Sequence, residues 1–241
     1  QDNGTQRTLG TLNWTAAFAG DGGEVCFHAQ DNDYILGETQ LNGVRRSTDG
    51  GITWVSATSG LYGFSAWVGP ILSHPTAAGI FYTARSSVFR STNWGANWVS
   101  ISSGISGIIR EMAISKTDPN IMYASVLDTM YRSTNAGVLY SSASSGLPGG
   151  IITSIYVHPD SSQVAFATIS EFGTGHVYKT TNTGASWIDI SGNLPDSPAN
   201  DVFIFDRGNG TYLYYAATDI GVFVTKNYGG SWTELAGGLP N

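Results

Sequence analysis

Short runs of apolar residues, many alternating with polar ones, recur along the whole chain, and Gly, Pro, Asn, Asp and Ser separate them. Residues 109–148 show the pattern clearly. Strands are predicted there at Ile109–Ser115, Ile121–Val126, Thr129–Ser133 and Leu139–Ala143, with a Pro-containing turn at 116–120. The segment Ser145-Gly146-Leu147-Pro148 ends this unit. The pattern therefore predicts four short strands joined by tight turns.

The same order of four strands recurs on both sides of this unit. The predicted strands are 23–29, 34–39, 44–47 and 53–57; 67–73, 80–84, 87–91 and 97–101; 153–158, 164–169, 176–180 and 186–190; and 201–205, 212–218, 221–225 and 231–235. Residues 1–18 resemble the second half of a further unit. The chain is therefore predicted to hold five complete repeats and a partial one.

A turn motif, Ser/Thr-x-Asp/Asn-x-Gly-x-x-Trp/Tyr, lies between the third and fourth strands of every complete repeat. An Asp or Asn side chain can accept hydrogen bonds from nearby backbone N–H groups and close such a turn. Gly supplies a conformation that a Cβ would resist, and the aromatic ring can pack beneath the turn. The copies are Ser47, Asp49, Gly51 and Trp54; Ser91, Asn93, Gly95 and Trp98; Ser133, Asn135, Gly137 and Tyr140; Thr180, Asn182, Gly184 and Trp187; and Thr225, Asn227, Gly229 and Trp232.

Repeats of about this length with four strands each are typical of β-propeller blades, whereas a solenoid usually has fewer strands per repeat. The Asp/Asn positions are spaced by 44, 42, 47 and 45 residues. The predicted fold is all-β, a multi-bladed propeller of four-stranded antiparallel blades. It forms one domain over 1–241, with blades at about 1–19 (partial), 20–60, 61–105, 106–147, 148–194 and 195–241. We expect it to be a fragment of a longer chain.

The motif and its period resemble those of Asp-box, or bacterial-neuraminidase-repeat, propellers, a group that includes sialidases, sortilin, photosystem II assembly propellers and family 74 xyloglucanases. The resemblance covers essentially the whole chain. The segments 1–5, 20–23 and 218–223 resemble the secreted sortilin- and xyloglucanase-like repeat proteins of bacteria. This resemblance implies a secreted or cell-surface location.

Composition narrows the possible functions. The formal net charge is −7 and no Lys/Arg run exceeds the pair Arg45-Arg46, which argues against a nucleic-acid partner. No apolar stretch approaches the length needed for membrane insertion. Cys26 is the single cysteine, so neither a disulfide framework nor a cysteine metal cage is possible. We predict no cofactor and no metal site.

Two carboxylates are candidates for glycoside hydrolysis, which uses a pair of such groups across the scissile bond. Asp219, in Thr218-Asp219-Ile220-Gly221, and Asp21, in Gly20-Asp21-Gly22-Gly23, resemble the catalytic segments of family 74 xyloglucanases. Their order along the chain is reversed, and the second segment lacks an apolar residue. The alternative is that both close turns between strands. Arg46, Arg90 and Arg132 recur beside the motif, so they do not form the arginine triad of a sialidase.

Several aromatic residues fall at positions suited to binding. Trp94 and Tyr228 lie inside the turn motifs, where we expect exposure or contact with the neighbouring hairpin. Tyr62, Phe64 and Trp67 precede an inner strand, and Trp67 is predicted to lie in the core. The leading hypothesis is a non-catalytic binding or scaffolding module for a glycan or protein partner. A xyloglucanase-like hydrolase is the alternative, and an assembly factor for a membrane complex ranks last because no basic or aromatic clustering is visible in the sequence.

Overall fold

The computed structural model describes residues 3–235 and consists of strands and their connections. Five antiparallel sheets of four strands follow one another, preceded by the two-stranded sheet β1 (Thr5–Arg7) and β2 (Thr15–Phe18). Blade 1 comprises β3 (Gly22–His28), β4 (Asp31–Thr39), β5 (Gly43–Ser47) and β6 (Val55–Ser56); blade 2 comprises β7 (Ile71–Ser73), β8 (Phe81–Ala84), β9 (Val88–Ser91) and β10 (Val99–Ser100); blade 3 comprises β11 (Glu111–Ile114), β12 (Met122–Val126), β13 (Thr129–Ser133) and β14 (Tyr140–Ser142); blade 4 comprises β15 (Ile151–Val157), β16 (Ala165–Ser170), β17 (Val177–Thr180) and β18 (Ile188–Asp189); and blade 5 comprises β19 (Ala199–Asp206), β20 (Tyr212–Thr218), β21 (Gly221–Thr225) and β22 (Thr233–Glu234). Every predicted repeat is thus one sheet.

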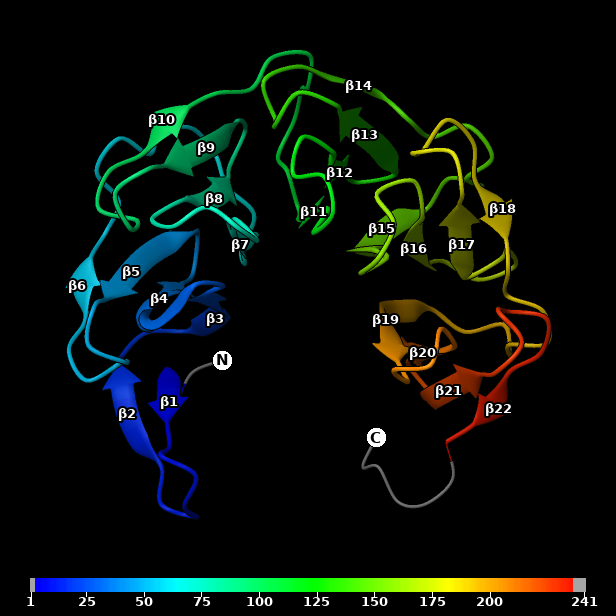
Figure 1. The fold of residues 1–241 in the computed structure, drawn as a ribbon, viewed down its shortest axis with the longest axis horizontal. Helices are drawn as coiled ribbons and strands as arrows, with labels where there is room; N and C mark the ends of the chain where they lie inside the picture. Colours follow the sequence, from blue (N-terminus) through cyan, green and yellow to red (C-terminus); the bar gives the residue numbers. More distant parts are fainter. Residues whose placement is uncertain (1–2, 236–241) are drawn as a thin grey trace.

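The five sheets stand side by side in an open ring, with their first strands innermost and their fourth strands at the rim (Figure 1). Within each sheet the strands pair in sequence order, so every blade is a simple meander. The sheet β1–β2 lies beside blade 1 at one end of the arc, and blade 5 lies at the other (Figure 1). No helix long and apolar enough to cross a membrane occurs within residues 3–235.

The core lies between blades rather than at one centre. Each apolar cluster joins two successive sheets; for example, Tyr123 of β12 and Ala143 after β14 pack with Ile155, Ala167 and Trp187 of blade 4. Strand residues alternate between the two faces of each sheet, so one set packs on the preceding blade and the other on the following blade. Because both faces are covered, apolar residues run almost continuously through the middle strands, as in Phe81–Ala84.

The predicted second repeat needs one correction. Its first strand begins at Ile71, not Trp67, because Gly69 and Pro70 interrupt the ladder before it. Trp67 therefore lies in the connection between blades 1 and 2, and its side chain is 50% exposed. The prediction that Trp67 is a core residue was wrong.

The turn motif, here called the Asp box, has the same geometry in all five blades. In the first box Ser47 Oγ accepts a hydrogen bond from Gly51 N at 2.8 Å, and Asp49 Oδ1 accepts one from Thr53 N at 2.9 Å. The two residues that follow the Asp or Asn of the box have positive φ. They are Gly50 and Gly51 in the first box, and Trp94 and Gly95 in the second. The hydroxyl and carboxylate thus satisfy the N–H groups of a turn that a regular ladder cannot pair.

The box tryptophans fasten one blade to the blade before it. Trp98 Nε1 donates to Ala57 O at 2.7 Å, and Trp232 Nε1 donates to Ile190 O at 2.9 Å. Each acceptor follows the fourth strand of the preceding blade. Trp54 is different, because its Nε1 donates within its own turn to Gly51 O at 3.0 Å. The Trp54 indole therefore hydrogen-bonds within its own turn, whereas those of Trp98 and Trp232 hydrogen-bond to the preceding blade.

Candidate functional site

Strand direction assigns the loops to two faces. Because the strands of each blade run antiparallel, the Asp boxes and the turns between first and second strands share one face, here called the box face. The turns between second and third strands and the links that enter each first strand share the opposite face, here called the mouth face. The sequence candidates Asp21 and Asp219 both belong to the mouth face, since one precedes β3 and the other joins β20 to β21.

Three carboxylates occupy one repeat position at the start of the innermost strands. Glu24, Glu111 and Asp201 each immediately precede the residue (Val25, Met112, Val202) that pairs with Gly37, Ala124 and Ala216 respectively. Those three partners lie two residues beyond the ones that pair with Ser47, Ser133 and Thr225 of the boxes. Register therefore places one carboxylate at the same height in blades 1, 3 and 5. Blades 2 and 4 carry Pro70 and Ser154 there.

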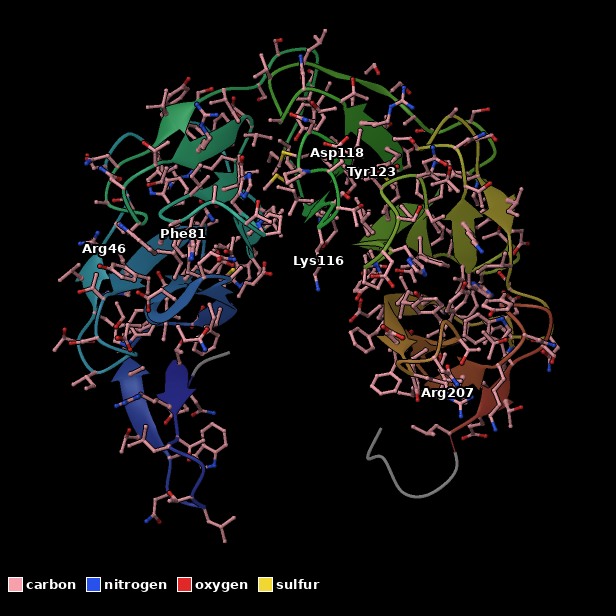
Figure 2. The ribbon with its side chains drawn as sticks, in the orientation of Figure 1. Arg46, Phe81, Lys116, Asp118, Tyr123 and Arg207 are labelled. Atoms are coloured by element: carbon pink, nitrogen blue, oxygen red, sulfur yellow. The ribbon has the colours of Figure 1, made fainter. Side chains whose placement is uncertain are left out.

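These carboxylates line the central cavity at the mouth face. The cavity has a volume of about 650 Å³, and its wall includes Glu24, Glu111, Asp201, Asn200, Thr153 and Tyr156. Ser154 Oγ donates to Asp201 Oδ1 at 2.7 Å, so blade 4 fixes the acid of blade 5. At the other end of the same central opening lies Lys116, which points into the middle of the ring (Figure 2). Because Glu24, Glu111 and Asp201 line it, the end of the central opening at the mouth face is acidic.

Packing against the surrounding blades raises the pKa of two of these acids. Burial raises the pKa of Glu111 to about 8, and the charges of Glu24 and Asp201 raise it further. Burial likewise raises the pKa of Glu24 to about 7, partly offset by a hydrogen bond from Ile71 N to its Oε2. The surrounding blades crowd Glu24, but the residue is exposed to solvent in the open cavity, so its proton can exchange with water. Near neutral pH the mouth can hold both protonated and ionised carboxyl groups.

Behind the mouth, a fully buried network fixes the loops of blades 1 and 2. Glu38 accepts hydrogen bonds from Gly69 N at 3.0 Å and from Asn42 Nδ2 at 3.1 Å. Asn42 Nδ2 also donates to Thr83 Oγ1 at 2.9 Å, and Arg85 Nη2 donates to Asn42 O. Burial raises the pKa of Glu38 to about 7. The network holds the loop that carries Tyr62, Phe64 and Trp67 in a fixed position.

Large apolar side chains are also exposed on loops of the mouth face. They belong to five mouth-face loops contributed by blades 1 to 5, and each side chain is about half exposed or more: Leu41, Tyr62, Phe64, Trp67, Leu127, Phe172 and Ile220. Leu41 and Leu127 also have φ of 59° and 54°, a left-handed conformation that is uncommon for leucine. Exposed apolar side chains gathered on one face are typical of interaction sites.

The two predicted catalytic residues are not part of the carboxylate set. Asp219 is exposed, and its Oδ1 accepts a hydrogen bond from Asn200 Nδ2 at 2.8 Å. Asp21 is half-buried, and its backbone N donates to Gln40 Oε1 at 3.2 Å. Neither carboxylate lines the central cavity. Among the described residues, no three His, Cys, Asp or Glu side chains are arranged to hold a metal ion.

The recurring arginines have a structural position. Arg132 Nη1 donates to Thr183 O in the box of the next blade, and Arg46 and Arg90 occupy the same position in their strands. Trp94 stacks on Tyr34 of blade 1 with 3.8 Å between ring centroids, so its predicted contact with the neighbouring hairpin is confirmed. Tyr228 is 47% exposed.

Comparison with known proteins gives fold matches without sequence relatives. No protein-family model and no curated protein matches the chain. Among solved structures, the GH74 xyloglucanase from Xanthomonas campestris matches with a TM-score of 0.71 at 15% identity, over 93% of this chain and 39% of that chain. An ancestral GH74 enzyme matches with a TM-score of 0.71 at 17% identity, over 92% of this chain and 32% of that chain. The chain thus spans about a third of the length of these enzymes.

YCF48 from Cyanidioschyzon merolae matches with a TM-score of 0.65 at 16% identity, over 93% of this chain and 74% of that chain. A structure of YCF48 bound to a D1 peptide matches with a TM-score of 0.62 at 13% identity, over 89% of this chain and 68% of that chain. With the blade order and the five boxes, these matches define the chain as a β-propeller of the Asp-box type. The predicted fold class and family resemblance are confirmed.

Proposed function

We propose that this propeller is a non-catalytic binding and scaffolding module whose partner docks on the mouth face. The observation that carries the proposal is that the mouth face holds both a cavity lined by Glu24, Glu111 and Asp201 and loops with exposed apolar side chains. Apolar contacts supply binding energy, and the carboxylates select a partner group that carries positive charge or hydrogen-bond donors. The rigid blades hold all of these loops in fixed relative positions.

A protein segment with Lys or Arg residues fits this face better than a glycan. The carboxylates of Glu24, Glu111 and Asp201 attract positively charged groups, which neutral sugars lack and which Lys and Arg side chains supply. A YCF48 structure of similar fold holds a D1 peptide, and this supports a protein partner for the present propeller. The array experiment described below also tests a glycan partner. We place the module in a secreted or cell-surface bacterial protein, as its family resemblance implies, and protease treatment of intact cells tests that location.

A glycoside hydrolase is the second candidate, favoured by the acids of the central cavity. A general acid at neutral pH needs a raised pKa, and Glu111 has one of about 8. Asp219 lies outside that cavity, so Glu111 is the better candidate acid.

One experiment separates these functions. The protein is applied to arrays of polysaccharides and of basic peptides, and released reducing ends are measured on the polysaccharides. We expect peptide binding without new reducing ends, and weaker binding in a Phe64→Ser/Trp67→Ser variant. Released ends that disappear in Glu111→Gln would establish the hydrolase. Released ends that disappear in Asp219→Asn alone would support Asp219, the candidate taken from the sequence, as the catalytic acid.

A further inference from the structure

A pocket on the box face, between blades 4 and 5, differs from every other junction of the ring. Its volume is about 330 Å³, and its wall includes His158, Lys179, Tyr212, Tyr214 and Tyr228. His158 belongs to the turn after β15 and Lys179 to β17, whereas the tyrosines come from blade 5. The pocket lies on the opposite face from the acidic mouth, so it is a separate site.

The internal repeats show what a purely structural junction contains. The position of Tyr228 inside the box holds Gly50, Trp94, Ala136 or Thr183 in the other blades. The position of Tyr214, which pairs with the box Thr225, holds Ile35, Phe81, Met122 or Ala165. Tyr212, two residues earlier, takes the place of Asp33, Gly79, Asn120 or Gln163. Three tyrosines therefore replace unlike residues at a single junction, although the fold does not require tyrosine there.

At the junction of blades 1 and 2, by contrast, the box aromatic fills the equivalent space. Trp94 stacks on Tyr34, and its ring centroid lies 4.8 Å from that of His28. At the junction of blades 4 and 5, Tyr228 contacts the Tyr214 ring at 5.6 Å and leaves nearly half of its own surface in solvent. His158 is covered instead by Tyr212, with 4.3 Å between centroids. The result is an open hollow with aromatic walls.

The polar groups of this hollow are mainly hydrogen-bond donors. Lys179 Nζ lies 5.6 Å from the Tyr214 centroid and 5.9 Å from the Tyr228 centroid. Residues 3–235 give this ammonium no carboxylate within 4.0 Å and no hydrogen-bond acceptor. Arg132, at the same repeat position, donates to a backbone carbonyl of the next box. Lys179 thus keeps its donor capacity free, whereas Arg132 uses one N–H to hold the next box.

His158 adds a second donor. Its Nδ1 accepts a hydrogen bond from Asp160 N at 3.2 Å, and burial lowers the pKa of the ring, so the neutral imidazole carries its proton on Nε2. Asp160 accepts a short hydrogen bond from the Tyr212 hydroxyl, and Asp206 is also close enough to influence His158. The charges of these two carboxylates oppose an anionic ligand, and the Tyr212 hydroxyl oxygen, which lines the pocket, can accept a hydrogen bond from a ligand hydroxyl.

We propose that this pocket binds a neutral sugar unit of a glycan, with its apolar face against Tyr228 and its hydroxyls on Lys179, His158 and the Tyr212 hydroxyl oxygen. A sugar ring combines an apolar face with hydroxyls that both donate and accept, which matches an aromatic wall edged by both kinds of group. The volume lies within the ordinary range of small-ligand sites. The open side of the hollow leaves room for the rest of the glycan chain.

Saturation-transfer NMR and calorimetry test this proposal, with methyl glycosides of glucose, galactose and mannose as probes, together with cellotriose and maltotriose. We expect at least one neutral probe to bind in the millimolar range or tighter. Tyr228→Gly recreates the turn that Gly50 makes in the first box, so the fold tolerates it, and we expect affinity to fall about tenfold or more. Lys179→Met is expected to act in the same direction, whereas Ile52→Ser, at an exposed apolar side chain of the first box, leaves sugar binding unchanged.

The contrary results are equally specific. Absence of saturation transfer to every probe overturns the site, as does equal binding by Tyr228→Gly and the unmodified protein. Tighter binding of methyl glucuronide than of methyl glucoside overturns the neutral class and points to an acidic sugar on Lys179. Because Phe64→Ser and Trp67→Ser alter the mouth face alone, a failure of the pocket leaves the proposed partner-binding function intact.

Discussion

Trp187 Nε1 donates a hydrogen bond to Ala143 O across the junction between blades 3 and 4, at 2.7 Å. The indole is 3% exposed, and its own backbone N donates to Ser145 O at 2.8 Å. One box residue is therefore held twice by the preceding blade. Trp98 repeats the arrangement with Ala57 and Ser59. The motif that closes a hairpin within one blade also connects neighbouring blades.

This connection predicts unequal effects of two identical substitutions. Trp187→Phe leaves the buried Ala143 carbonyl without a partner and is expected to cost about 1–3 kcal/mol of unfolding free energy. Trp54→Phe removes a bond within one turn on a half-buried ring, so a smaller loss is expected. Urea denaturation of both variants measures the difference. Equal losses would mean that the hydrogen bond between blades contributes no more to stability than the one within a single turn.

The glycine of the Asp box is expected not to tolerate a larger residue, both because its φ is positive and because a Cβ would collide with a neighbouring side chain. An alanine Cβ at Gly184 would lie 2.9 Å from Cε1 of the fully buried Tyr123, and φ there is +73°. At Gly149, φ is +89° but nothing lies within 4 Å. Gly149→Ala therefore bears only the left-handed strain of about 1–2 kcal/mol. Gly184→Ala should destabilise the protein by clearly more, and a comparison of the two melting curves decides the point.

The channel acids predict a pH dependence of stability. The pKa of Glu111 rises on folding to about 8, so the folded state binds its proton more tightly than the unfolded chain does. Stability from this group is therefore full at pH values below the unfolded pKa and declines as the pH rises through 8. Glu111→Gln is expected to raise the melting temperature at pH 8.5 and to change it little at pH 4. Glu234→Gln, at an exposed carboxylate, serves as the control; the same gain at both pH values in Glu111→Gln would contradict the assignment.

The mouth-face network gives a prediction for the loop that it holds. Glu38→Ala leaves Gly69 N and Asn42 Nδ2 without their shared acceptor in a fully buried site. A loss of about 1–3 kcal/mol is expected, with faster hydrogen exchange in residues 62–69 than elsewhere in blade 2. Uniform exchange across blade 2 would show that the network does not position this loop.

Local periodicity was sufficient to predict the blades, because strand pattern and box recur within each stretch of the chain. The boundaries of the outer strands were less predictable: β6 is only Val55–Ser56, since the box turn and the blade-to-blade link take up the neighbouring residues. The same reasoning misplaced Trp67, because Gly69 and Pro70 delay the strand that was expected to bury it.

The candidate site was largely invisible in the sequence. Glu24, Glu111 and Asp201 are separated by whole blades, and only the strand register shows that they share one repeat position. The exposed apolar side chains of the mouth face, such as Leu41 and Phe172, also come from separate blades. The number of residues between each acid and its box Ser/Thr differs among blades 1, 3 and 5 because the intervening turns differ in length, so sequence alignment alone does not bring the three acids together.

The central claim is that the mouth face binds the partner, and site-specific photocrosslinking tests it most directly. A photoreactive residue is placed at Phe64 on the mouth face or, as a matched control, at Ile52 in an Asp box, where the side chain is 66% exposed. Each protein is mixed with an envelope extract of the source cells. The account predicts a discrete crosslinked partner from position 64, reduced by Glu24→Lys/Glu111→Lys, and none from position 52. Crosslinking from position 52 alone, or equally from both, would contradict it.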